Sequence, residues 1–146
     1  MRKITLLSLL LMTFFTFASA QSINLGCYQS RVLQYPHYHY YDENFTIKIK
    51  TFNLSERQIV EFGYPVSTNY VITFETSETM TDIKGKRFSF ISGVIHNSSK
   101  YKRIFISSWY GTSDVWVTLD NGLIISGERR ETAYYCKLQK PAQRPY

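Results

Sequence analysis

Residues 45–52 read Phe-Thr-Ile-Lys-Ile-Lys-Thr-Phe, and this stretch decides the fold class. Phe45, Ile47 and Ile49 fall on one side of an extended chain, while threonine and lysine fall on the other side. Strict alternation of apolar and polar residues is the pattern of a half-buried β-strand, not of a helix. We therefore expect a strand here, with its apolar face turned toward a core.

The same alternation returns along the rest of the chain, and helical periodicity is almost absent after residue 20. Further strands are predicted over residues 58–62, 70–75, 87–95, 103–108, 115–119, 123–126 and 132–138. Gly93 interrupts one of them and is expected to mark a β-bulge. About eight strands separated by turn-forming residues predict an all-β domain, either an antiparallel β-sandwich or a small β-barrel.

The clearest turn signal is Asp120-Asn121-Gly122, which lies between two apolar runs. Asn-Gly readily adopts the positive φ angles that a type I′ hairpin turn requires. We expect residues 115–119 and 123–126 to pair through this turn.

The first 20 residues have the features of a secretory signal peptide. Arg2 and Lys3 precede an uncharged apolar stretch over residues 4–17, and Ala18-Ser19-Ala20 offers small residues to signal peptidase. The apolar stretch reaches about 21 Å as a helix, which is shorter than the bilayer core of about 30 Å. We expect cleavage after Ala20 and a secreted or periplasmic location.

Cleavage leaves a single domain over residues 21–140 and a loose tail over residues 141–146. No later run is apolar enough to form a transmembrane segment in the mature chain. A domain of this size can bury a core without a metal ion or another cofactor, and we predict none. The sequence leaves the oligomeric state open.

Two cysteines, Cys27 and Cys136, lie near opposite ends of the mature chain. In an oxidising compartment the simplest arrangement is one disulfide between them. In the alternative, Leu25-Gly26-Cys27 is a lipoprotein processing site, and Cys27 becomes a lipidated N-terminus. The disulfide is favoured, because Asn24 stands where such processing sites usually carry an apolar residue.

Two segments are candidate contact surfaces. The first is rich in tyrosine, which provides a large contact area at low entropic cost. Its candidate residues are Tyr35, His37, Tyr38, His39 and Tyr40. The second segment is basic and flanks the hairpin expected from residues 87–95 and 103–108. Its candidate residues are Lys84, Lys86, Arg87, Lys100, Lys102 and Arg103.

The charge distribution indicates the kind of partner. Residues 21–83 carry a net charge of −3, and residues 84–146 carry +7. A basic face suits an acidic protein or an anionic glycan. We do not expect nucleic acid, because loss of Arg2 and Lys3 lowers the net charge from +6 to a modest +4. The alternative is an ordinary solvated surface on which lysine protects edge strands from aggregation.

Residues that could support catalysis or metal binding occur together only in residues 35–43, which we call the Tyr/His segment. His37 and His39 share a strand face, and Asp42 or Glu43 could join them around Cu(II) or Zn(II). Because no third fixed ligand accompanies the two histidines, we predict no metal site. The sequence contains no G-x-S-x-G, no H-E-x-x-H and no phosphate-binding glycine loop.

Tyr35-Pro36-His37 resembles the Tyr-Pro-His-x-Tyr stretch of the fungal guanyl-specific ribonucleases, small secreted proteins with a disulfide that joins the chain ends. The resemblance implies that Tyr35 flanks the phosphate and that His37 is a catalytic acid or base. Glu61 and Arg103 would then act as the carboxylate base and the phosphate ligand. His96 precedes Arg103, which reverses the order of that family.

Residues 131–137 resemble strand F of an immunoglobulin variable domain, in which Tyr-x-Cys closes the disulfide between the two sheets. Cys27 lies 109 residues before Cys136, farther than in that family, and only ten residues follow Cys136. The resemblance therefore implies at most a sandwich architecture, and no binding site is carried over.

Three glycosylation sequons, used only in a eukaryotic source, begin at Asn44, Asn53 and Asn97.

Together these features predict a small exported β-domain that acts by binding a protein, a glycan or another anionic partner, as an inhibitor does, and not by catalysis. A ribonuclease-like hydrolase that uses His37 is the first alternative. A structural component of a cell surface or matrix is the second.

Overall fold

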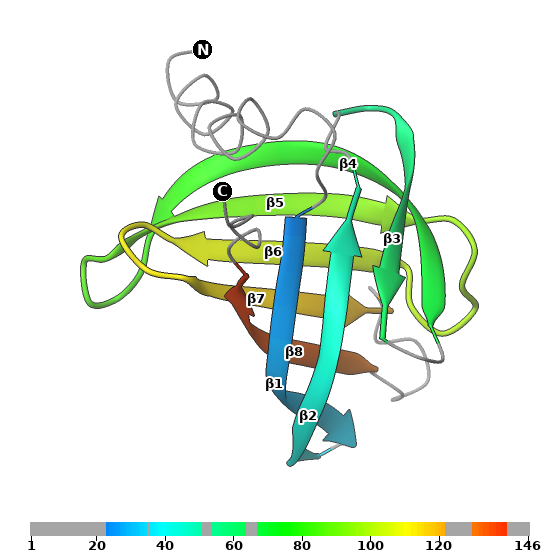
Figure 1. Ribbon diagram of the computed structural model, residues 1–146, viewed down its shortest axis with the longest axis horizontal. Coiled ribbons are helices and arrows are strands. Elements are labelled where there is room, and N and C mark those ends of the chain that lie inside the picture. Colours follow the sequence, from blue (N-terminus) through cyan, green and yellow to red (C-terminus); the bar gives the residue numbers. More distant parts are fainter. Residues whose placement is uncertain (1–22, 35, 51–53, 64–66, 122–129, 140–146) are drawn as a thin grey trace, which may run out of the picture.

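The computed structural model describes residues 23–34, 36–50, 54–63, 67–121 and 130–139. Their strands are β1 Ile23–Gln34, β2 His37–Ile49, β3 Arg57–Phe62, β4 Thr68–Thr81, β5 Arg87–Ile95, β6 Arg103–Trp109, β7 Asp114–Asp120 and β8 Glu131–Leu138. Each strand pairs antiparallel with the next, and β8 pairs with β1, so that one sheet closes into a barrel (Figure 1). The expected all-β fold is confirmed.

Each strand sends alternate side chains into the barrel and out of it. In β7, Val115, Val117 and Leu119 are buried, whereas Trp116 is 43% exposed. The interior is mainly aliphatic, and burial of each such side chain contributes about 1.5–3 kcal/mol to folding. Its large apolar members with almost no exposure are Leu25, Ile47, Val60, Ile72, Phe74, Ile104, Val117 and Leu119.

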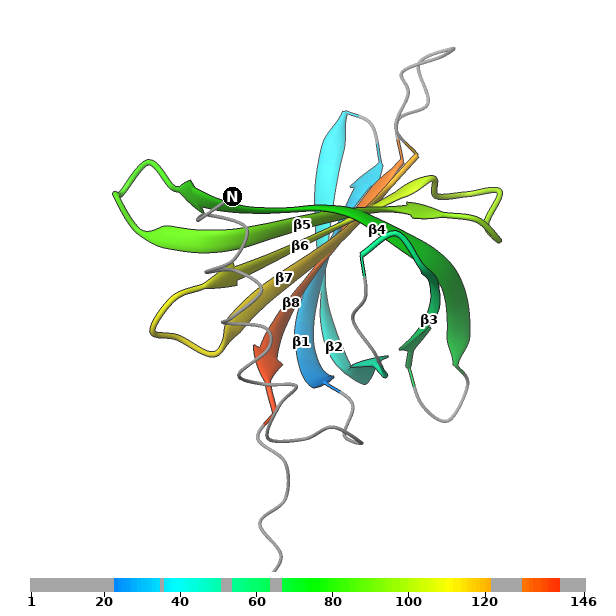
Figure 2. The ribbon, with the colours of Figure 1, turned by 90° about the horizontal axis from the view of Figure 1, so that it is seen from above.

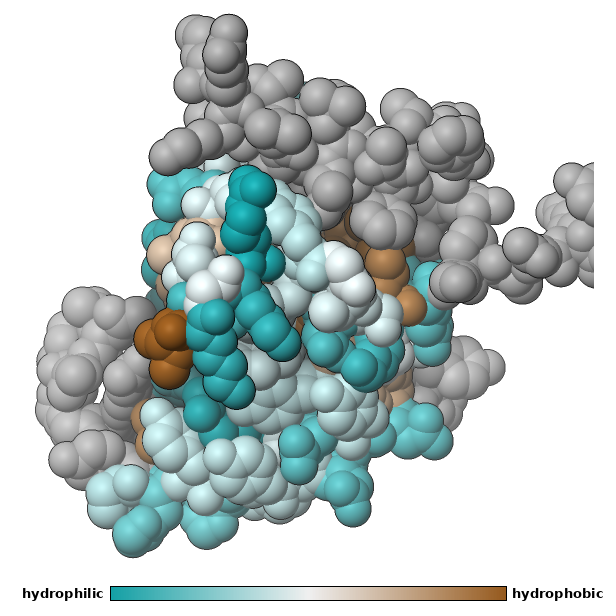
Figure 3. Space-filling view, turned by 90° about the vertical axis from the view of Figure 1, so that its left-hand side faces the viewer, coloured by the Kyte–Doolittle hydropathy of each residue, from teal (hydrophilic) through white to brown (hydrophobic). Residues whose placement is uncertain are grey.

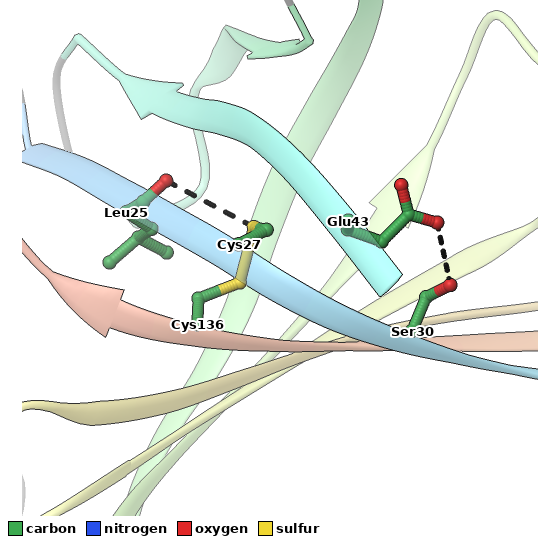
Figure 4. The surroundings of a disulfide bond; sticks show 5 residues. All are labelled: Leu25, Cys27, Ser30, Glu43 and Cys136. Atoms are coloured by element: carbon green, nitrogen blue, oxygen red, sulfur yellow. Dashed lines mark hydrogen bonds between the residues drawn. A yellow bond between two sulfur atoms is a disulfide. The ribbon is translucent and has the colours of Figure 1, made fainter. Parts of the chain in front are cut away.

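A disulfide fastens the barrel where its first and last strands meet. Cys27 on β1 lies directly opposite Cys136 on β8, and their sulfur atoms are bonded (Figure 4). Both residues are buried, and their Cα atoms lie 4.1 Å apart. The predicted disulfide is confirmed. It joins neighbouring strands of one sheet, so the immunoglobulin-like arrangement of two sheets bridged by a disulfide is not formed.

The barrel is closed less completely on the side of β3. Only residues 47–49 of β2 pair with β3, whereas β1 and β2 pair along almost their whole lengths. In the described part of the chain, residues 37–45 of β2 therefore have no strand partner on their second edge. The tip of the β1–β2 hairpin extends beyond the barrel (Figure 2), while β8 pairs with β1 as far as Val32.

Two sequence predictions need correction. Residues 23–34 form β1, although no strand was expected there, because a bulge after Cys27 interrupts the alternation. The prediction that residues 115–119 and 123–126 form a tight hairpin is wrong. Residues 114–120 of β7 pair instead with β8, beginning with Asp120 opposite Glu131. The other edge of β7 is taken by β6, so the long-range ladder overrides the local preference of Asn-Gly.

The strand expected over residues 123–126 lies outside the described residues, as do the expected signal peptide and the expected C-terminal tail. No helix in the described part of the chain has the length and hydropathy needed to span a bilayer. The bulge expected near Gly93 is found on the partner strand, where β4 carries an extra residue between Phe74, opposite Gly93, and Thr76.

Tyr134 is partly buried against the barrel core. Tyr134 packs edge-to-face against Phe45 and Phe62, with ring centroids 5.2 and 5.7 Å apart. Burial, assisted by the nearby Tyr101 and Tyr70, raises the pKa of Tyr134 far above its ordinary value. The folded protein therefore holds this proton at a pH at which the unfolded chain has already released it.

Removal of the disulfide should destabilise the barrel strongly. The bond closes a loop with a sequence separation of 109 residues, for which the chain-entropy model gives about 4–5 kcal/mol. We expect the double substitution Cys27→Ala, Cys136→Ala to lower the free energy of unfolding by up to this amount in urea denaturation. A loss of less than about 1 kcal/mol would show that the seam is held without the bond.

The buried phenol should make stability fall at alkaline pH. Above about pH 10 the unfolded chain binds fewer protons than the folded one, so the free energy of unfolding decreases as pH rises. Each retained proton contributes a slope of about 1.4 kcal/mol per pH unit. In Tyr134→Phe we expect a shallower decline by up to this amount, measured by urea denaturation across the alkaline range. An unchanged slope would contradict the burial of Tyr134.

Candidate functional site

Four aromatic side chains form a continuous row across the outside of β5, β6, β7 and β8. Phe88 stacks on Trp109 with ring centroids 5.0 Å apart, and Trp109 lies 4.7 Å from Trp116. Trp116 meets Tyr135 edge-to-face at 5.0 Å. We call these four residues the outer aromatic row. Cross-strand contacts of this kind are each worth about 0.5–1.5 kcal/mol beyond the area that they bury.

The row continues onto the β1–β2 hairpin through an arginine. Arg31 lies 4.4 Å from the ring centroid of Tyr38 and forms an ion pair of 3.2 Å with Glu131. Although burial alone lowers its pKa, the nearby Tyr135, Glu131 and a hydrogen bond with Tyr40 hold the pKa of Arg31 above its ordinary value. Arg31 therefore carries a permanent positive charge among three tyrosine rings. We call Arg31, Tyr38 and Tyr40 the arginine cluster.

The guanidinium of Arg31 is only partly satisfied. Its Nε atom is buried and has no hydrogen-bond partner among the described residues. A buried donor without an acceptor costs about 1–3 kcal/mol, so native proteins tolerate few of them. Such a donor beneath a contact surface is consistent with a functional constraint on this position.

The opposite end of the row is fixed by an acidic side chain in the β4–β5 turn. Asp82 accepts hydrogen bonds from the indole N–H of Trp109 at 3.1 Å and from the backbone N–H groups of Lys84 and Lys86 at 2.9 Å. The bond from Lys86 contributes most to lowering the pKa of Asp82 below its ordinary value, with Trp109 and Lys84 adding to it. The turn therefore sets the orientation of the Trp109 ring.

The residue pattern of β5, β6 and β7 explains why the row forms. Along each strand one set of alternate positions is mainly aliphatic and faces the core, while the other set mixes aromatic with polar residues and faces outward. A second outward pair, Phe90 and Phe105, stacks at 5.6 Å beside the row. The signal that could have found the row is the recurrence of aromatic residues at outward positions of three successive strands.

The predicted Tyr/His segment is exposed. His37, Tyr38, His39 and Tyr40 lie on the projecting part of β2, and Tyr40 is 59% exposed. Tyr35 lies outside the described residues. Of these residues, Tyr38 and Tyr40 join the arginine cluster. Within the described ranges, no three His, Cys, Asp or Glu residues lie close enough together to hold a metal ion.

The predicted basic residues do not form one surface. Lys84, Lys86 and Arg87 lie at the β4–β5 turn, next to the outer aromatic row, and Arg87 is 5.4 Å from the ring centroid of Tyr110. The side of the molecule at the β4–β5 and β6–β7 connections presents mostly hydrophilic and intermediate residues around a small strongly apolar spot (Figure 3).

The other three basic residues, Lys100, Lys102 and Arg103, lie at the β5–β6 connection, where Arg103 pairs with Glu75 at 3.1 Å. The full length of β5, about 27 Å of extended chain, separates the two groups. The hairpin was correctly predicted, but its two flanks lie at opposite ends of the sheet.

The residues implied by the ribonuclease resemblance are also dispersed. His37 begins β2, whereas Glu61 on β3 pairs with Lys48 near the other end of β2. The eleven positions from His37 to Lys48 correspond to roughly 36 Å of extended strand. Arg103 lies on β6 in an ion pair with Glu75. The structure does not bring His37, Glu61 and Arg103 into one site.

Of the three sequons, Asn44 is exposed on β2 and Asn53 lies outside the described residues. Asn97 is exposed after β5, but its side-chain amide is already in use. It donates to the Asn69 carbonyl and accepts from the Val71 N–H, both at 2.8 Å. Asn97 therefore holds the β5–β6 connection against β4.

A polar groove of about 290 Å³ lies on the outside of β1, β2 and β3, away from the outer aromatic row. Its lining residues are Asn24, Thr46, Lys48, Glu61, Gly63 and Gln139. Glu61 is paired with Lys50 at 3.1 Å. Among the described residues that line the groove there is no histidine or cysteine.

Comparison with protein-family models, with curated proteins and with solved structures finds no match to this chain. The interpretation of the outer surface therefore rests on its own geometry.

Protonation of Asp82 should be visible at Trp109 and not at Trp116. Because its pKa is lowered, the hydrogen bond to Trp109 is present above the ordinary aspartate pKa and is lost only as the pH falls through the lower folded value. We expect the indole ¹H–¹⁵N signal of Trp109 to titrate below that ordinary value, while the signal of Trp116 serves as the control. In Asp82→Asn this titration should disappear, and its persistence would contradict the assigned contact.

Proposed function

We propose that this chain is an exported binding protein that recognises a protein partner through the outer aromatic row and the arginine cluster. The signal peptide expected over residues 1–20, with cleavage after Ala20, would deliver it to an extracellular or periplasmic compartment. The buried disulfide fits an oxidising compartment of that kind.

The observation that carries the proposal is the composition of one continuous surface. Trp116 is 43% exposed, Tyr38 44% and Tyr40 59%, and Arg31 lies among the tyrosines. Tryptophan, tyrosine and arginine are the residues most enriched at the energetic centres of protein interfaces. Clusters of large exposed apolar side chains on a small soluble domain usually mark an interaction surface.

The ring geometry favours a protein over a stacked planar ligand. Stacking platforms present exposed ring faces to the ligand. In the outer aromatic row the faces pack against neighbouring rings, with Phe88 and Trp109 inclined by 24° and Trp116 and Tyr135 by 84°. Ring faces covered in this way are poorly available for stacking on a flat ligand, whereas the exposed parts of Trp116, Tyr38 and Tyr40 suit the mixed apolar and polar surface of a protein.

Charge at the end of the row selects the partner further. Lys84, Lys86 and Arg87 are exposed, and among the described residues none of them forms an ion pair within 4 Å. They give the surface a positive end at the β4–β5 turn, whereas Arg31 at the other end is paired with Glu131. Complementary potentials raise association rates and exclude partners of the wrong charge. The proposed partner is therefore a protein with an acidic rim around an apolar patch.

Substitutions on the two basic groups should have unequal effects. We expect Lys84→Glu with Lys86→Glu to weaken capture of the partner from the extracellular or envelope fraction of the source organism. Lys100→Glu with Lys102→Glu, at the far end of β5, is the matched control and should leave capture unchanged. Trp116→Lys should abolish capture, since a central tryptophan typically contributes more than about 2 kcal/mol. Loss of capture in the control pair alone would overturn the assignment of the surface.

A further inference from the structure

The free edge of β2 is a second feature that a binding surface does not explain. Residues 36–42 are all exposed, whereas Ser30 and Leu33 on the neighbouring β1 are buried. In the described part of the chain, only β1 pairs with this stretch of β2. Its second edge presents a row of backbone N–H and C=O groups, which is the template for adding another strand.

From His37 to Tyr41 this edge carries none of the usual protections against pairing, and a bulge in the ladder with β1 follows Asp42. Proteins usually guard edge strands with lysine, proline, a bulge or a charge that points inward. From His37 to Tyr41 the strand contains only histidine and tyrosine, and its ladder with β1 is regular as far as Asp42. β8 pairs with the other edge of β1 only as far as Val32, so at Tyr38 and His37 the hairpin has just two strands, and a further strand would stabilise it there.

The residue order of the edge is complementary to itself in the antiparallel direction. Its first half contains the two histidines, and its second half ends with Asp42 and Glu43. Antiparallel pairing of two copies centred on Tyr40 places Tyr38 opposite Asp42, and His39 opposite Tyr41. It also brings His37 toward Glu43, whose carboxylate accepts a hydrogen bond from Ser30 on the same hairpin at 2.8 Å, whereas parallel pairing would set the acidic residues side by side. Opposite charges and aromatic pairs across strands are stabilising, and like charges are destabilising.

We propose that two copies of this chain associate through the β2 edges, residues 37–43, as an antiparallel pair related by a two-fold axis through Tyr40. Such an interface is isologous, so each contact occurs twice. Because the axis is perpendicular to the joined sheet, the outer faces of both copies lie on the same side. If the proposed function holds, the dimer presents two partner-binding surfaces together, and a multivalent partner would be bound with increased avidity.

The register makes a charge-swap experiment decisive. His39→Lys combined with Tyr41→Lys puts two lysines directly opposite each other, twice per dimer. His39→Lys combined with Tyr41→Glu instead puts lysine opposite glutamate and is the matched control. His39 and Tyr41 are both exposed in the single copy, so the substitutions leave the barrel core untouched.

The measurement is sedimentation velocity of the mature chain up to about 100 µM, because an edge of this size belongs to the small, weak class of interfaces. We expect a wild-type dimer, at least a tenfold weaker association for the Lys/Lys variant, and retained association for the Lys/Glu variant. Matching urea midpoints would confirm that both variants are folded.

Three results would overturn the proposal. They are a monomeric wild type throughout the concentration range, equal association of the two variants, or a dimer that Trp116→Lys disrupts while Lys/Lys does not. The last result would place the contact between copies on the outer aromatic row. The experiment uses no partner, so its failure is separate from a failure of the proposed function.

Discussion

Pairing of the first strand with the last is the constraint on which the rest of this structure depends. Once β8 pairs with β1, the sheet acquires an inside and an outside, and each strand must divide its side chains between them. The Cys27–Cys136 disulfide lies in this seam and fixes the register of the two strands most distant in sequence. Long-range pairing of this kind is slow and entropically costly, and a covalent bond reduces that cost in the unfolded chain.

Closure also explains why apolar residues occur on both sides of β5, β6 and β7. The core-facing positions of these strands are mainly aliphatic, and Phe88, Trp109 and Trp116 occupy outward positions, where they pack on one another. A row of this kind has a cost in solubility that a monomeric domain has no structural reason to bear. The arginine cluster and the Asp82 turn hold its two ends in place, which is the organisation expected of a contact surface.

Strand periodicity predicts most of this architecture, because alternation records burial directly. The strands from residue 45 onward and the disulfide follow from the sequence, whereas β1 does not, since its bulge breaks the alternation. The hairpin predicted from Asn-Gly is wrong for a related reason. Both edges of β7 are already paired, one with β6 and the other with β8. Tyr38 and Tyr40 were predicted from composition, but their link to Tyr135 through Arg31 depends on the β1–β8 seam and is not visible in one strand.

The two ends of the basic hairpin show the same limit. Lys86 and Lys102 are close in sequence order around one hairpin, yet antiparallel geometry places them at opposite ends of β5. Counting charge along the chain therefore predicted one basic surface where the structure has two separate groups. It also did not predict that Asp82 accepts hydrogen bonds from Lys84, Lys86 and Trp109 together.

The central claim is that the partner meets the outside of β5–β8, and site-specific photo-crosslinking tests it most directly. A photoreactive phenylalanine analogue is placed at position 116 on β7 or at position 59 on β3, where Ile59 is also 50% exposed. In the native extracellular or envelope environment, we predict a defined crosslinked protein from position 116 and none from position 59. Crosslinking from position 59 alone would contradict the account.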